Sequence, residues 1–399
     1  MTQRTSIHGL HVATPLYQFI EEKVLPAVGV TSKTFWAGFD GIVKDLAPQN
    51  IALLAERDRI QLEMDKWHTA NPGPVSDAKA MKAYRKHLSS IGYLVPEPKS
   101  PKATTQDVDA ELAVLAGPQL VVPSTNARFV LNAANARWGS FYDCLYGTDA
   151  MGGLPPKGGF DNGRGARVVA RSAVFLDEVF PVEATSHAKA SKYQIVDGAL
   201  MVDGSPLKSP AAFVGYTGEP ATPKSILLRN NGLHVELVFD ATHPIGKTTP
   251  SGMADVVLES AMSAIIDLED SVACVDAEDK VLAYRNWLGL MKGDLQETFE
   301  KGGKMMTRRL NADRTFTSAT GGEMTLKGRA LLLVRNVGHL MTNPAILDRN
   351  GDEVFEGLMD AVITVLIAMH DLGRTSGPRS PKALPRRSKP ITPAPPALR

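Results

Sequence analysis

The sequence predicts an α/β fold built on part of a parallel β/α barrel, with helices before it and an antiparallel segment inserted into it. Two apolar runs, 265–266 and 331–334, end abruptly in charged residues. Strands of a parallel barrel deliver polar groups to their carboxyl ends in this way. From about residue 150 the pattern changes to glycine-rich loops and short paired strands, which indicates an insertion.

Composition narrows the class of protein. The chain has 399 residues, a length that predicts two or three compact units. Of these residues 43% are hydrophobic and 22% are charged, as in a globular protein. A net charge of +1 gives no case for a nucleic-acid or membrane partner. The two cysteines, Cys144 and Cys274, fit a reducing compartment and lack zinc-site spacing. No signal peptide is evident, and the longest apolar run, 361–369, is too short to span a bilayer. We therefore expect a cytoplasmic protein.

Residues 14–92 have a helical pattern. Ser32 is expected to cap a first helix, and Pro48 fits the first turn of a second, where its missing N–H costs nothing. Ser76 and Asp77 are expected to open a third helix. A proline-rich stretch at 96–101 then predicts a linker.

The barrel prediction rests on three candidate strands, and the insertion on two hairpins. The strands are expected at 118–123, 262–268 and 330–335, and the first is expected to be buried. Asp197-Gly198 and Asn230-Asn231-Gly232 are turn signals between apolar runs. Further helices are expected at 168–180, 280–290 and 354–372. A closed barrel of this type has about eight strands, so three strands predict an incomplete one.

The strongest candidate for chemistry is the acidic group after the second of these strands. In a strand, Asp267 and Glu269 would share one face while Asp270 turns away. Clustered carboxylates suit a hydrated divalent cation, bound directly or through water. The alternative is that Asp270 and Ser271 cap the next helix while the other acids form salt bridges.

Arg335 follows four apolar residues and is the candidate cationic group. A guanidinium at a barrel mouth can clamp a carboxylate and stabilise a developing oxyanion. The alternative is an ion pair with one of the acids just named. His339 is a possible base, although a packed loop histidine is the simpler interpretation.

Other arginines stand beside aromatic residues or beside each other. Arg128-Phe129 and Arg137-Trp138 could stack an adenine or pack against themselves. Arg308 and Arg309 could bind a phosphate or form a solvated face. No P-loop and no dinucleotide glycine fingerprint occurs.

The composition changes after Arg374. Residues 374–399 contain seven prolines, seven basic residues and no acid. Such a segment could bind nucleic acid or proline-recognition domains, or could result from translation in another reading frame. The second interpretation is favoured because the change comes where a barrel needs more strands.

Several long stretches together resemble the malate synthase family, in its long bacterial G form. They are 116–123, 126–147, 267–271, 284–290 and 334–343, within a resemblance that runs from residue 1 to about 374. The resemblance implies a TIM (β/α)8 barrel, here incomplete, with an N-terminal α-helical clasp and an inserted α/β domain. It also implies a Mg²⁺-dependent condensation of acetyl-CoA with glyoxylate, followed by hydrolysis to malate and CoA, in a monomeric enzyme of the glyoxylate bypass.

By matching motif, the resemblance implies that Arg335 is the catalytic arginine and contacts glyoxylate. It implies that Glu269 and Asp270 lie in the outer shell of the magnesium ion. The residues implied at acetyl-CoA are Val121, Arg128, Phe129, Ser271 and Arg308.

The expected domains follow the chain. They are 1–100 for the clasp and linker, 101–135 for a first barrel segment, 136–260 for the insertion, 261–292 for a second barrel segment, 293–329 for the rest of the insertion, 330–373 for a third barrel segment, and 374–399 for a disordered tail.

The family's direct magnesium ligands and its catalytic aspartate have no counterpart here, so we expect this chain to be inactive alone. The alternatives are a non-catalytic fragment that binds acetyl-CoA or a complementary polypeptide, and a related barrel lyase acting on CoA esters.

Overall fold

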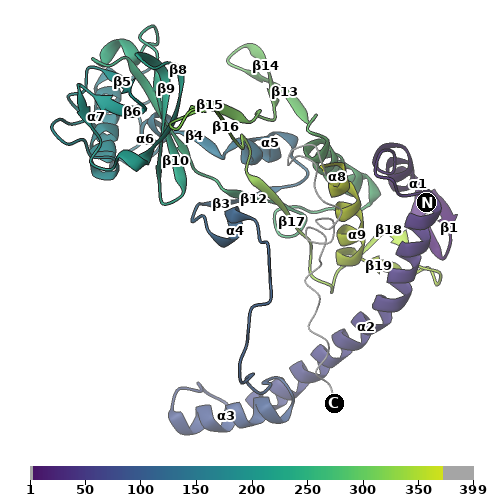
Figure 1. Ribbon diagram of the computed structural model, residues 1–399. Helices are drawn as coiled ribbons and strands as arrows, with labels where there is room; N and C mark the ends of the chain where they lie inside the picture. Colours follow the sequence, from purple (N-terminus) through teal and green to yellow (C-terminus); the bar gives the residue numbers. More distant parts are fainter. Residues whose placement is uncertain (1–2, 372–399) are drawn as a thin grey trace. The chain divides into compact units, whose positions relative to one another are not determined.

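The computed structural model describes residues 3–371, and the proline- and arginine-rich segment 374–399 lies outside this part (Figure 1). The chain divides into two compact units, each assembled from separate stretches of sequence. Among the described residues, the first unit contains 3–107, Leu268–Lys292 and 335–371. The second unit contains Val108–Asp267 and Gly293–Val334. Each unit is described separately below.

Long helices open the first unit. Helix α2 (Ser32–Ala70) is capped by Thr31, whose side chain accepts a hydrogen bond from the N–H of Thr34, and not by Ser32 as predicted. The helix runs unbroken through Pro48, so the predicted boundary there is wrong. A proline inside a helix loses one hydrogen bond, and on this largely exposed helix water can satisfy the freed carbonyl. Helix α3 (Ala78–Ser90) begins after Asp77, which caps it as predicted.

The rest of the first unit is a small sheet with helices around it (Figure 1). Four strands pair in the order β1-β2-β18-β19, so the start of the chain pairs with residues more than 300 positions away. Helix α1 packs against α8 and is followed by a π-helical turn, and α8 packs against α9. The bounds are β1 Arg4–Ile7, β2 Leu10–Ala13, α1 Thr14–Phe19, the turn Ile20–Val24, α8 Ala277–Lys292, β18 Thr342–Leu347, β19 Glu353–Phe355 and α9 Glu356–Ala368. The two expected helices, 280–290 and 354–372, are therefore confirmed as α8 and α9, with α9 two to four residues shorter at its ends.

A seven-stranded antiparallel sheet dominates the second unit, in the order β16-β15-β8-β9-β10-β11-β4. Both predicted hairpins are present, with Asp197-Gly198 and Asn231-Gly232 at positive φ in their turns. Helices α6 and α7 contribute to a shared apolar core with these strands. The bounds are β4 Trp138–Ser140, α6 Phe141–Gly147, α7 Asn162–Val179, β5 Tyr193–Val196, β6 Ala199–Val202, β7 Ser205–Pro206, β8 Phe213–Glu219, β9 Thr222–Asn230, β10 Leu233–Phe239, β11 Met253–Glu259, β15 Arg314–Ser318 and β16 Glu323–Leu326.

The three strands predicted for a barrel form one three-stranded sheet, in the order β17-β12-β3. Strand β12 (Ser263–Asp267) pairs in parallel with β3 (Gln119–Pro123), and β17 covers Leu331–Arg335. Strand β3 is half exposed and not buried as expected, because it has a neighbour on one edge only. The described residues thus give a mixed α/β structure with an open parallel sheet.

Four smaller elements are the helices α4 and α5 and the strands β13 and β14. Helix α5 (Ala127–Asn135) follows β3 and packs against the hairpin of β13 (Gln296–Lys301) and β14 (Lys304–Arg309). The short helix α4 (Ala110–Ala113) precedes β3. Within residues 3–371, no helix is both long and apolar enough to cross a membrane.

Candidate active site

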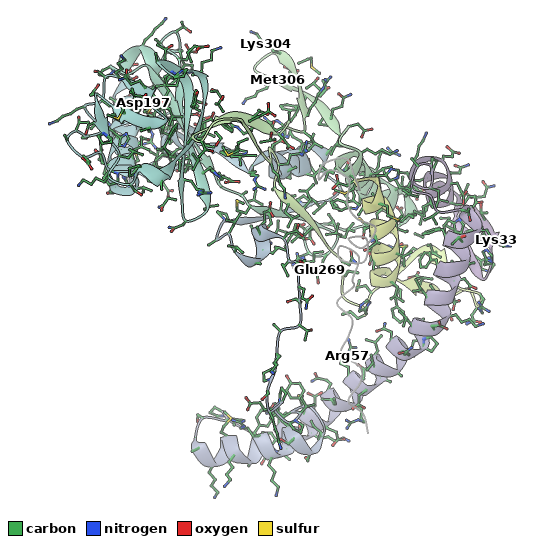
Figure 2. All side chains as sticks on the ribbon, viewed as in Figure 1. Lys33, Arg57, Asp197, Glu269, Lys304 and Met306 are labelled. Atoms are coloured by element: carbon green, nitrogen blue, oxygen red, sulfur yellow. The ribbon has the colours of Figure 1, made fainter. Side chains whose placement is uncertain are left out.

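The ends of β12 and β17 bring the predicted acids and the predicted arginine together. The N–H of Leu268 donates a 2.9 Å hydrogen bond to the carbonyl of Arg335, which fixes these two chain segments side by side. From there Arg335 Nε lies 3.2 Å from Glu269 Oε2, and an Arg335 terminal nitrogen lies 3.4 Å from Asp270 Oδ2. The structure therefore brings these three predicted residues together at, or just beyond, the ends of neighbouring strands. Figure 2 labels Glu269 in this region.

The predicted geometry of the acids needs a correction. Strand β12 ends at Asp267, which is fully buried, so Glu269 and Asp270 lie in the loop beyond it. Asp270 does not turn away from Glu269, because the loop directs both carboxylates to Arg335.

The next helix is not capped by the residues considered for that role. Helix α8 begins at Ala277, and Asp276 accepts a hydrogen bond from the N–H of Asp279. Asp270 and Ser271 lie five or more residues before the helix and are exposed. The capping alternative is wrong, whereas the alternative of an ion pair to Arg335 describes the observed contact.

The guanidinium of Arg335 is the group that could bind an anion, but two carboxylates already lie beside it. Arg335 and Glu269 each keep about a third of their side-chain surface exposed. Ion pairs of such exposure contribute roughly 0–1 kcal/mol, so an incoming carboxylate can compete for the guanidinium at little cost. Arg335 is thus held in place and remains accessible.

The magnesium ion implied by the resemblance does not fit the described residues as they stand. Within residues 3–371, no three His, Cys, Asp or Glu side chains are grouped so that they could hold a metal ion. Glu269 and Asp270 are two carboxylates already paired with a cation.

A second group of predicted residues lies in the second unit, around α5. Asn126 caps this helix by accepting a hydrogen bond from the N–H of Phe129. This cap places Arg128 and Phe129 in the first turn, both exposed. Val121, on β3, is half exposed, and α5 packs against β3. Three of the residues predicted at acetyl-CoA therefore lie on neighbouring elements.

Arg308 joins this group through the β13–β14 hairpin. Its guanidinium donates a hydrogen bond to Asn132 of α5 and lies 5.7 Å from the centre of the Phe299 ring. Arg128 lies 5.3 Å from the same ring and 5.9 Å from that of Phe129. Phe299 was missed by the sequence analysis; the signal for it was Gly302-Gly303 between two polar strands, which is typical of a hairpin turn.

The remaining candidates have structural or peripheral positions. Arg137 is buried and forms salt bridges with Glu111 and Glu259, at 2.9 and 2.8 Å. The ring of Trp138 is covered by Arg314, whose guanidinium carbon is 4.5 Å from the ring centre. His339 is exposed, its ring lies close to Gly357, and its carbonyl accepts a hydrogen bond from Asn50. The carbonyl of Arg309 accepts a hydrogen bond from Asn135.

The buried Arg137 cluster leads to a prediction about acid stability. Burial raises the pKa of Glu111, but hydrogen bonds from Arg137 and Lys327 outweigh this effect and lower the pKa to about 2. A lowered carboxyl pKa stabilises the fold above the unfolded-state value, and this stabilisation is lost as pH falls from about 4.5 towards 2. We expect Glu111→Gln to lower the unfolding free energy by ~2 kcal/mol at pH 7 and by much less at pH 2.5. Denaturant unfolding of both proteins at the two pH values measures this, and an equal deficit at both would contradict it.

Comparison with known proteins gives the context of both groups. Residues 15–78 match a model of the malate synthase N-terminal domain, and residues 160–230 match a model of the α-β insertion domain of malate synthase G. A malate synthase G of Corynebacterium efficiens is 51% identical over 378 residues, which are 92% of this chain and 50% of that protein. The chain is thus similar to one half of the length of that malate synthase G. The position of the N-terminal domain match is consistent with the N-terminal half.

Two further relatives agree with this assignment. The malate synthase G of Corynebacterium glutamicum is 49% identical, and that of Halalkalibacterium halodurans is 48% identical. They too match 92% of this chain, which spans about half the length of these relatives. The α-β insertion of malate synthase G coincides with the part of the second unit that runs from α7 to β9.

Proposed function

We propose that this chain forms part of a malate synthase, in which acetyl-CoA condenses with glyoxylate and the product is hydrolysed to malate and CoA. The observation that carries this proposal is the match at about 50% identity to three malate synthase G proteins over 92% of the chain. The Arg335 cluster supports it, because it presents a cation at the end of a parallel strand, where barrel enzymes place their chemistry.

The reaction requires two charges to be stabilised. Glyoxylate carries a carboxylate, and removal of a methyl proton from acetyl-CoA places negative charge on the thioester oxygen. A base from outside the described residues takes up the methyl proton, and the resulting carbon nucleophile forms a bond to the aldehyde carbon of glyoxylate. The aldehyde oxygen takes up a proton and becomes the hydroxyl of malate. Water then adds to the thioester carbonyl and displaces the CoA thiol, which leaves the second carboxyl group of malate. In this scheme Arg335 contacts the glyoxylate carboxylate and stabilises the enolate oxygen, a role in which aligned N–H donors are worth several kcal/mol.

The other parts of the proposal extend the same assignment. The β17-β12-β3 sheet would be three strands of a TIM barrel, interrupted by the insertion, with the domain limits given above. Glu269 and Asp270 would lie in the outer shell of a magnesium ion whose direct ligands come from outside the described residues. Ser271 would contact acetyl-CoA, together with Val121, Arg128, Phe129 and Arg308. We also propose that the protein is a monomer located in the cytoplasm.

Complementation tests this function. The 399-residue chain is co-expressed with the half of the C. efficiens malate synthase G that it does not match. We expect release of CoA thiol that depends on both glyoxylate and Mg²⁺ from the pair, and none above a heat-treated control from either half alone. If the pair is soluble and copurifies but releases no CoA, the proposed function is wrong.

A further inference from the structure

The ring of Phe299 has a guanidinium group beside it from each of two elements. Arg128 comes from the first turn of α5, and Arg308 comes from β14. Their guanidinium carbons lie 5.3 and 5.7 Å from the ring centre, within the distance at which a cation is attracted to an aromatic face. One half-buried phenylalanine therefore sets the position of two cations.

Neither guanidinium is neutralised by an acidic side chain. In the part of the chain that the structure describes, no ion pair joins Arg128 or Arg308 to a carboxylate, although Glu297 is the cross-strand neighbour of Arg308. Two like charges near one ring repel each other, and an aromatic face offsets only about 0.5–1 kcal/mol per cation at an exposed site. A bound anion would remove the remaining repulsion.

The hairpin that carries Phe299 is fastened to α5 and is not a loose loop. Asn132 accepts a hydrogen bond from Arg308, and Asn135 donates a 2.8 Å hydrogen bond to the carbonyl of Arg309. Asn135 also accepts a 2.8 Å hydrogen bond from the N–H of Asn311. Lys304, labelled in Figure 2, begins β14 directly after the turn at the other end of the hairpin, whereas Met306 is the cross-strand partner of Phe299. The hairpin is thus fastened to α5 at Arg308 and Arg309, and Phe299 lies two residues along β13 from the cross-strand partner of Arg308.

Exposed apolar surface lies on the same elements. Phe129 is 42% exposed and Val121 is 50% exposed, which is unusual for large apolar side chains on a helix and strand in mutual contact. An aromatic base can stack on such a surface while phosphate groups meet the guanidinium groups. This combination matches a phosphorylated nucleotide better than a simple inorganic anion.

We propose that Phe299 is a positioning residue for nucleotide phosphates, which holds Arg128 and Arg308 where they can contact the phosphate groups of one bound nucleotide. The inference rests on the proposed function, since the nucleotide would be the adenosine 3′,5′-bisphosphate end of a CoA ester. Phe299 acts through the two arginines and need not contact the ligand itself.

The test measures binding and therefore needs no complementing half. Calorimetric titration of the 399-residue chain uses CoA, adenosine 3′,5′-bisphosphate and phosphate-free adenosine as separate probes. We expect Phe299→Leu, which keeps apolar bulk but removes the aromatic face, to weaken bisphosphate binding about tenfold while adenosine affinity changes less than twofold. Phe299→Tyr should restore the bisphosphate affinity.

Two controls separate positioning from general damage to the unit. Phe160→Leu alters another exposed aromatic residue of the second unit, which stacks on Tyr146, and should leave all three affinities unchanged. Combining Phe299→Leu with Arg308→Gln should weaken bisphosphate binding by clearly less than the product of the two separate effects, because both changes disable the same contact.

The outcomes distinguish this inference from the proposed function. If wild type and Phe299→Leu bind CoA and the bisphosphate equally well, the inference is overturned and the proposed function stands. If Phe299→Leu weakens the binding of adenosine and of the bisphosphate by the same factor, Phe299 contributes only apolar contact surface, and the positioning role is overturned. If the wild-type chain binds none of the probes, the acetyl-CoA site of the proposed function fails as well.

Discussion

Replacing Arg335 by lysine is expected to lower the glyoxylate-dependent release of CoA by the complemented pair about 10²–10³-fold. Lysine keeps the positive charge but loses the planar fork that can bind a carboxylate and an enolate oxygen through separate N–H groups. Arg335 sits at the last position of β17, with its carbonyl fixed by the N–H of Leu268. The loss should therefore appear in kcat/KM for glyoxylate, measured by thiol release.

Arg329→Lys is the matched control for this prediction. Arg329 lies just before the amino end of β17, away from the carboxyl end that carries Arg335, and forms a 3.5 Å ion pair with Asp313. We expect its replacement to change kcat/KM less than threefold. The unfolding free energy of Arg335→Lys should stay within ~1 kcal/mol of wild type, because the ion pairs of Arg335 are solvent-exposed. Activity retained in Arg335→Lys would show that Arg335 only stabilises the loop after β12.

The site could be predicted where a local pattern determines a three-dimensional position. Arg335 and Glu269 each follow an apolar run, and parallel strands align their carboxyl ends. The sequence alone therefore predicts that the two side chains lie close together, as they do. The hairpin turns are determined just as locally, since Asp197-Gly198 and Asn231-Gly232 adopt the positive φ angles that those residue types tolerate.

The errors arose where distant contacts or solvent decide the structure. Strands β1 and β2 have four residues each, and β2 is held by β18 from the far end of the chain, so no local signal indicates the pairing. The sequence predicts a helix start at Pro48, yet the remaining hydrogen bonds of a 39-residue helix outweigh the one that proline removes. Phe299 acquires its importance only from Arg128 and Arg308, which approach it from separate elements.

Removing the charge of Lys280 is expected to destabilise the first unit by ~3–5 kcal/mol, the largest stability effect predicted for this chain. The side chain of Lys280 is fully buried, and its Nζ lies 2.9 Å from Asp360 and 2.5 Å from Glu356. Tyr284 donates a further hydrogen bond to Asp360. Burial opposes the charge of Lys280, but the charges and hydrogen bonds of Asp360 and Glu356 together outweigh this effect and raise the lysine pKa.

Lys280→Met keeps the length of the side chain and leaves two buried carboxylates without their cation. Denaturant unfolding should show the deficit at pH 7, and it should shrink towards pH 4 as the unpaired carboxylates take up protons. The control Lys66→Met removes an exposed pair with Glu63, 2.7 Å apart, and should cost less than ~0.5 kcal/mol.

Restoring charge balance decides between two explanations of the Lys280 deficit. If the deficit comes from uncompensated charge, adding Glu356→Gln and Asp360→Asn to Lys280→Met should recover most of the lost stability, because neutral amides are cheaper to bury than carboxylates. If the triple variant is as unstable as Lys280→Met, the lysine stabilises α8 and α9 through packing of its aliphatic stem. A fall below ~1 kcal/mol in Lys280→Met itself would show that water or local rearrangement satisfies the carboxylates, and that the ion pairs contribute little to holding the two helices together.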